Sequence, residues 1–145
     1  MLEQMIIGFF STSIALSTPL ILGAIGEVFA ERSGVMNLGV EGMMIMGALS
    51  GFLALAVTGD PWTATIIATL IGGLMSLIHA VLSISLRANQ LLSGLALTMF
   101  GLGVSGFLGQ PLLGVSAKGL PVIPVPLLDQ IPYLGEILFQ HDPIT

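Results

Sequence analysis

The polar side chains that could bind or react with a small molecule gather in one glycine-rich segment, residues 26–51. Its candidate site residues are Glu27, Asn37 and Glu41. Carboxylates accept hydrogen bonds and an amide both donates and accepts them, so this set suits the recognition of a small polar solute. A structural role fits as well, because Glu27 would flank an interfacial turn and Glu41 would favour the helix dipole from a first helical turn. The residues alone leave both interpretations open.

Other kinds of chemistry have little support in the sequence. The chain has no cysteine, which excludes a disulfide framework, a thiolate nucleophile and a cysteine metal site. His79 stands near a predicted helix end with Ser76 and Ser83, where we expect hydrogen bonding rather than metal binding or proton transfer. The second histidine, His141, lies in the tail, far from metal-ligand spacing. We therefore predict no catalytic residue, no metal and no cofactor.

The composition indicates that these residues belong to a membrane protein. Hydrophobic residues make up 54% of the 145 and charged residues 8%, with a mean hydropathy of +1.05. A soluble domain carries about 25% charged residues, so a water-soluble enzyme is excluded. The net charge of −5, without a basic cluster, argues against nucleic acid as a partner. The predicted fold class is an all-α, polytopic helix bundle in a lipid membrane.

Long uncharged runs predict four transmembrane helices, because about 20 apolar residues cross the hydrocarbon core of a bilayer. We place these helices at about 5–28, 38–58, 62–86 and 89–109. Together they form a transmembrane region over residues 1–109. The glycine-rich segment would then break the path from the first helix to the second, as discontinuous helices do where transporters expose polar groups to solute.

The basic residues predict the orientation through the positive-inside rule. Arg32 lies between the first and second predicted helices and Arg87 between the third and fourth, so both fall on one side of the membrane. The third basic residue, Lys118, falls on the other side. We therefore expect a multi-pass protein of the cell (inner) membrane whose Arg32 and Arg87 are cytoplasmic and whose amino terminus is extracytoplasmic.

Small residues recur at helical spacing on two of the predicted helices. Such stripes let two backbones approach closely, which is how helices associate in lipid. The stripe on the third predicted helix consists of Ala64, Ala68, Gly72, Ser76 and Ala80. The stripe on the fourth consists of Gly94, Thr98, Gly101 and Ser105. We expect both stripes to pack against neighbouring helices.

Residues 110–145 differ from the helical region in their proline content. Six of the eight prolines fall here: Pro111, Pro121, Pro124, Pro126, Pro132 and Pro143. Prolines at this density exclude a regular helix over GLPVIPVPLL. We expect an extended extracytoplasmic loop, with a short interfacial helix near Tyr133–Phe139; a disordered tail is the alternative, although the segment is more apolar than disordered chains usually are. The loop would lead to a second half that the chain lacks.

A family resemblance is carried by residues 26–48, GEVFAERSGVMNLGVEGMMIMGA, and continues in residues 79–109, HAVLSISLRANQLLSGLALTMFGLGVSGFLG. These segments resemble the inner-membrane permeases of binding-protein-dependent ABC importers, in the branch for simple sugars and nucleosides. The likeness is greatest to the second permease of purine-nucleoside uptake systems. It implies that the ERSG turn is cytoplasmic and that the following helix lies in the bundle core.

The resemblance implies a permease subunit that forms part of the path for a nucleoside or simple sugar. It also implies the partners: a second permease subunit, two cytoplasmic ATPase subunits and an external solute-binding lipoprotein. ATP hydrolysis would belong to the ATPase subunits, and the chain itself has no Walker motif. Glu27, Asn37 and Glu41 would line the solute path or its gate. Family members continue for about as many residues again, so we expect an amino-terminal fragment that is inactive alone.

Two alternatives stay open beside this interpretation. The chain could be a structural or assembly subunit that conducts nothing, which copurification with or without ATPase partners would test. It could also be a permease for another solute, such as a branched-chain amino acid. A small intramembrane enzyme is disfavoured because no nucleophile, base or metal set converges at helical spacing.

Overall fold

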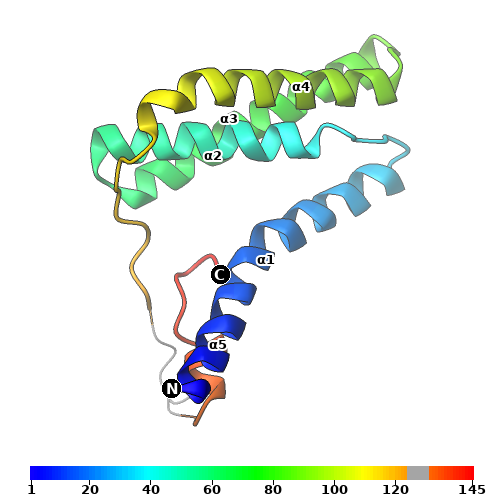
Figure 1. Ribbon diagram of the computed structural model, residues 1–145. Coiled ribbons are helices and arrows are strands. Elements are labelled where there is room, and N and C mark those ends of the chain that lie inside the picture. Colours follow the sequence, from blue (N-terminus) through cyan, green and yellow to red (C-terminus); the bar gives the residue numbers. More distant parts are fainter. Residues whose placement is uncertain (124–130) are drawn as a thin grey trace. The chain divides into compact units, whose positions relative to one another are not determined.

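The computed structural model is all-α and describes residues 1–123 and 131–145 (Figure 1). Among these residues, four helical segments are long and apolar enough to cross a membrane: Leu2–Arg32, Val40–Thr58, Pro61–Ser85 and Gln90–Leu112. Within the described residues the structure contains no β-strand. The predicted fold class, an all-α polytopic bundle, is confirmed.

The elements follow one another as α1 (Leu2–Arg32), α2 (Val40–Thr58), α3 (Pro61–Ala80), the π-helical turn η1 (Val81–Ser85), α4 (Gln90–Gly109), the 3-10 turn η2 (Gln110–Leu112) and α5 (Leu134–Leu138). α1 extends beyond the predicted 5–28 at both ends. α2 begins at Val40 rather than 38, because a turn over Leu38 and Gly39 precedes its first helical residue. The predicted third helix, 62–86, corresponds to α3 followed by η1.

The contacts divide the chain into two compact units, residues 1–24 with 120–145 and residues 25–119. The division falls inside α1, so the last turns of α1 belong to the second unit. All candidate site residues lie in the second unit. In the first unit, α5 occupies the predicted position near Tyr133–Phe139. The extended loop predicted over 110–145 includes residues 124–130, which lie outside the described residues.

In the second unit, α2 runs alongside both α3 and α4 (Figure 1). The closest approach is between α2 and α4, where glycines face each other. A Cβ atom added at Gly42 would lie 2.5 Å from the carbonyl oxygen of Leu97, and one at Gly101 would lie 2.7 Å from the carbonyl oxygen of Gly42. Only glycine fits such backbone contact. Beside it, Met43, Met75 and Leu97 form a small buried apolar cluster.

The small-residue stripes occupy different environments along their lengths. On α4, Gly101 is buried against Gly42 of α2 and Gly94 against Leu38 and Gly39, which precede α2, while Thr98 and Ser105 are half-buried. On α3, Ala64 is buried, and the Ala68 Cβ would lie 3.0 Å from a Cβ added at Gly51. Gly72 has more room, since its nearest neighbour is the Met43 carbonyl oxygen at 3.8 Å. Farther along, Ser76 is exposed and Ala80 is half-buried.

The turn between α2 and α3 is closed by Asp60, which caps α3. Its carboxylate accepts hydrogen bonds from the backbone amides of Trp62 (3.3 Å) and Thr63 (2.9 Å) and from the Thr63 hydroxyl. The hydroxyl bond, followed by the amide bond of the same residue, lowers the pKa of the Asp60 carboxyl from its ordinary value. The ionised carboxylate is therefore the form that stabilises this helix end.

We expect Asp60→Ala to lower the melting temperature of the purified protein near neutral pH, because it removes the cap of α3. The pKa is lower in the folded state than the unfolded value of about 3.9. The carboxylate thus stabilises the fold above that pH, and its contribution is lost as the pH falls through the folded pKa. Melting curves of both proteins from neutral pH to about pH 3 should converge at the acid end. A difference in melting temperature between the two proteins that grows toward acid pH would contradict the assignment of the ionised Asp60 carboxylate as the helix cap.

Candidate functional site

The candidate site centres on the loop between α1 and α2, residues 33–39, which we call the α1–α2 loop. Side chains from α4 bind its backbone. The Met36 amide donates to the Gln90 side-chain oxygen at 2.8 Å, and the Gln90 side-chain nitrogen donates to the Gly34 carbonyl at 3.4 Å. The Thr98 hydroxyl donates to the Leu38 carbonyl at 3.0 Å. The connections α1–α2 and α3–α4 therefore meet at one end of the second unit.

Glu27 and Asn37, two of the sequence-predicted site residues, contact each other. The backbone amide of Asn37 donates to Glu27 Oε1 at 3.0 Å, and Asn37 Oδ1 accepts from the Gly39 amide at 3.1 Å. The second bond gives Asn37 a local turn that leads the chain into α2. Glu27 Oε2 is buried without a hydrogen-bond partner among the residues that the structure describes.

His79 lies at the end of α3 and is only 3% exposed. Its Nδ1 is 3.1 Å from the Ser93 hydroxyl, and its Nε2 is 3.2 Å from the Met36 carbonyl oxygen and 3.4 Å from the Ser83 hydroxyl. The ring is thus hydrogen-bonded, as its sequence position suggested, but its partners come from the α1–α2 loop, η1 and α4. In the described residues, no three His, Asp or Glu side chains are arranged to hold a metal.

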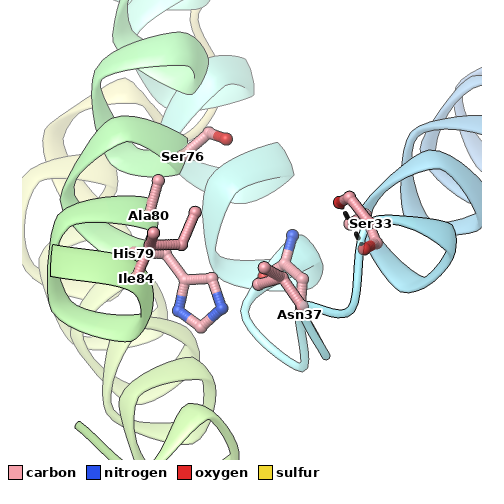
Figure 2. A pocket seen from close by; sticks show the side chains of 8 residues that line it. Ser33, Asn37, Ser76, His79, Ala80 and Ile84 are labelled. Atoms are coloured by element: carbon pink, nitrogen blue, oxygen red, sulfur yellow. Dashed lines mark hydrogen bonds between the residues drawn. The ribbon is translucent and has the colours of Figure 1, made fainter. Parts of the chain in front are cut away.

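A pocket of about 160 Å³ opens between the α1–α2 loop and α3. Its lining residues are Ala30, Ser33, Val35, Asn37, Ser76, His79, Ala80 and Ile84. Figure 2 shows the His79 imidazole extending from α3 toward the loop that carries Asn37. The polar lining is uncharged apart from the titratable imidazole, and it offers hydroxyl, amide and imidazole groups beside apolar walls. Such a lining offers hydrogen bonds to neutral polar groups, and the pocket is smaller than the roughly 300–1,000 Å³ of sites that enclose a whole small-molecule ligand.

Glu41 is placed apart from the other two predicted residues. It is exposed in the first turn of α2 and does not line the pocket. The structure therefore brings together Glu27 and Asn37 but not Glu41.

Sequence reasoning missed Gln90 and Ser93 as residues of the site, and it assigned His79 only a local role. All three fall in residues 79–109, the second segment of the family resemblance. That resemblance was the one signal that could have drawn attention to them.

The fold and the site together define a multi-pass membrane protein with a loop that is bound by side chains of neighbouring helices at one end of the second unit. Residues 9–134 match the family described as "branched-chain amino acid transport system / permease component". The chain belongs to this permease family. The resemblance carried by residues 26–48 and 79–109 is thereby confirmed.

Curated relatives carry the names of sugar and nucleoside permeases. The chain is 40% identical over 138 residues to the guanosine ABC transporter permease protein NupQ of Bacillus subtilis, covering 88% of this chain and 43% of that protein. It is 37% identical over 134 residues to the nucleoside ABC transporter permease protein NupC of Lactococcus lactis, covering 85% and 42%. It is 39% identical over 137 residues to TsgC13 of Haloferax volcanii, a proposed glucose ABC transporter permease, covering 92% and 42%.

The chain thus spans less than half the length of these curated relatives. No solved structure matches it significantly.

Proposed function

We propose that this chain is part of the permease subunit of an ABC importer and forms part of the path for a nucleoside or simple sugar. The observation that carries the proposal is the pocket under the α1–α2 loop, whose lining of Ser33, Asn37, Ser76 and His79 offers hydrogen bonds without a fixed charge. Nucleosides and sugars are neutral and rich in hydroxyl groups, so they match such a lining. The names of the relatives support the same solute class.

Glu27, Asn37 and Glu41 are the proposed path or gate residues. Glu27 and Asn37 are joined by a hydrogen bond beside the pocket. Glu41 is exposed on a helix long and apolar enough to span the membrane. A carboxylate there is too costly to leave in lipid, so it faces water, solute or another subunit.

The proposal includes the arrangement of the whole transporter. A second permease subunit would complete the path, two cytoplasmic ATPase subunits would hydrolyse ATP, and an external lipoprotein would deliver the solute. Residues 1–109 would form the transmembrane region, and residues 110–145 would form an extracytoplasmic loop leading to the second half.

The proposed orientation places Arg32 and Arg87 in the cytoplasm and the amino terminus outside. The hydrogen bonds of Gln90 to Met36 and Gly34 support a common side for Arg32, the last residue of α1, and Arg87, which precedes α4. Cysteines introduced singly at Ser33 and Ala88 should be shielded in intact cells from a membrane-impermeant thiol reagent. Cysteines at Asp60 and Val115 should be labelled. The opposite labelling pattern would overturn the orientation.

Solute competition tests the proposed function. Cells that lack their own uptake systems would express the full-length permease with its partners and take up radiolabelled guanosine. Unlabelled nucleosides or simple sugars should compete, whereas leucine should not. Competition by leucine would favour a branched-chain amino acid permease. Failure of the chain to copurify with any ATPase subunit, together with absent uptake, would favour an assembly subunit.

A further inference from the structure

The peptide unit that joins Met36 to Asn37 is bound from two helices at once. Its carbonyl oxygen, on Met36, lies 3.2 Å from His79 Nε2 at the end of α3. Its N–H, on Asn37, donates at 3.0 Å to Glu27 Oε1 on α1. Because a peptide unit is planar, these two bonds at opposite edges set the orientation of the whole plane. They therefore also set the direction in which Asn37 leaves the backbone.

The hydrogen-bond partners determine which ring nitrogen of His79 carries the proton. A backbone carbonyl can only accept, so the bond to the Met36 oxygen requires a hydrogen on Nε2, and the Ser83 hydroxyl, 3.4 Å from the same nitrogen, then faces that nitrogen as an acceptor. In the neutral ring Nδ1 then has a lone pair and accepts from the Ser93 hydroxyl at 3.1 Å. Ser93 is itself buried on α4, so the ring is held on both sides.

We propose that His79, as the Nε2–H tautomer, is a positioning residue for solute binding: together with Glu27 it clamps the Met36–Asn37 peptide plane and so directs Asn37 at the pocket. The positioning itself follows from the contacts, while its effect on solute rests on the proposed function. His79 is 97% buried whereas Met36 is 53% exposed, so the bond from Nε2 anchors a partly exposed loop to a buried side chain at the end of α3. Removing the ring would free the peptide plane to rotate.

Two substitutions remove the imidazole ring of His79, and only one of them retains a hydrogen-bond donor near the position of Nε2. His79→Gln places an amide nitrogen near the position of Nε2, so it retains a donor for the Met36 carbonyl. His79→Asn is shorter and places its amide near Nδ1, so it reaches Ser93 but not Met36. His141→Gln is the matched control, because His141 also bonds a backbone carbonyl, that of Ile137 at 2.8 Å, but lies in the first unit.

The positioning claim is tested without transport. A cysteine at Val35, a half-buried pocket residue of the α1–α2 loop, reports on the loop through its rate of reaction with a thiol reagent. In the full-length permease we expect His79→Asn to raise this rate on the order of tenfold, the scale of one lost buried hydrogen bond. His79→Gln and His141→Gln should stay near the parent rate. Equal rates in all four proteins would overturn the proposal.

Nitrogen NMR of the unsubstituted permease, labelled at histidine, supplies a second measurement that needs no variant at position 79. The His79 signal should report the Nε2–H tautomer, and the Nδ1–H tautomer would overturn the proposal even if a variant fails to fold.

Uptake by the complete transporter then tests the consequence for solute. His79→Asn should raise the KM for solute about tenfold with little change in maximal rate, and His79→Gln should restore most of the affinity. If His79→Asn raises the labelling rate of the Val35 cysteine but leaves the KM unchanged, His79 positions the peptide plane without affecting solute binding, and the proposed role in solute binding is overturned. Absent uptake by the parent transporter would count against the proposed function, and the labelling and NMR results would still decide the clamp.

Discussion

Gly42→Ala is expected to destabilise the purified full-length permease strongly and to lower its abundance in the membrane. The added Cβ would lie 2.5 Å from the Leu97 carbonyl oxygen and 2.7 Å from the Thr98 Cα, both in the backbone of α4. Neither atom belongs to a flexible side chain, so α2 and α4 must move apart. Overpacking of this kind costs about 1–3 kcal/mol, and rigid backbone on both sides places this site at the upper end.

Gly103→Ala is the matched control on α4. A Cβ at Gly103 meets nothing within 4 Å, and alanine is a better helix former than glycine by about 1 kcal/mol. The melting temperature of Gly103→Ala should therefore equal or exceed that of the parent. Equal melting temperatures for Gly42→Ala and Gly103→Ala would show that the α2–α4 contact does not hold the bundle together.

Asn37→Ala is expected to reduce solute uptake by the complete transporter on the order of tenfold at unchanged membrane abundance. The substitution removes the acceptor for the Gly39 amide and the one side-chain amide that lines the pocket. A tenfold change corresponds to about 1.4 kcal/mol, the scale of one hydrogen bond between the solute and the Asn37 amide. Uptake should be measured as an initial rate and normalised to permease in the membrane.

Glu41→Gln tests the exposed carboxylate in the same assay. If Glu41 faces the solute path, uptake should fall severalfold, whereas a role on the helix dipole alone is worth about 0.3–1 kcal/mol and should leave uptake nearly intact. Glu3→Gln is the control, because Glu3 is an acidic residue in the first turn of α1, outside the proposed path. If both Asn37→Ala and Glu41→Gln take up solute at the rate of the parent, the glycine-rich segment (residues 26–51) has only a structural role.

The fold could be predicted from the sequence because the lipid bilayer strongly restricts which segments can span it. Uncharged runs of about 20 residues have few alternatives to spanning helices, and the four predicted spans correspond to the four found. The start of α2 was less accessible. Its position depends on the hydrogen bond of Asn37 Oδ1 to the Gly39 amide, a local turn that hydropathy does not register.

The candidate site could be predicted only in part, because some of its residues lie far apart in the sequence. Glu27 and Asn37 stood out as polar residues in an apolar region, and they lie 10 residues apart along the chain. His79 and Gln90 reach the same loop from 43 and 54 residues away. Such pairs depend on how α3 and α4 pack against α2, which periodicity in one sequence does not specify. Gly42 was missed likewise, because nothing in a glycine-rich run marks which glycine lies nearest to another backbone.

The most direct test of the account is uptake by a reconstituted transporter. The full-length permease would be purified with the proposed partner permease and ATPase subunits and placed in proteoliposomes, with the proposed binding lipoprotein and radiolabelled guanosine outside and ATP inside. Guanosine should accumulate only when ATP and the lipoprotein are present, and its accumulation should fall on the order of tenfold in Asn37→Ala. Sealed vesicles that contain the assembled complex, hydrolyse ATP and yet accumulate neither nucleoside nor simple sugar would contradict it.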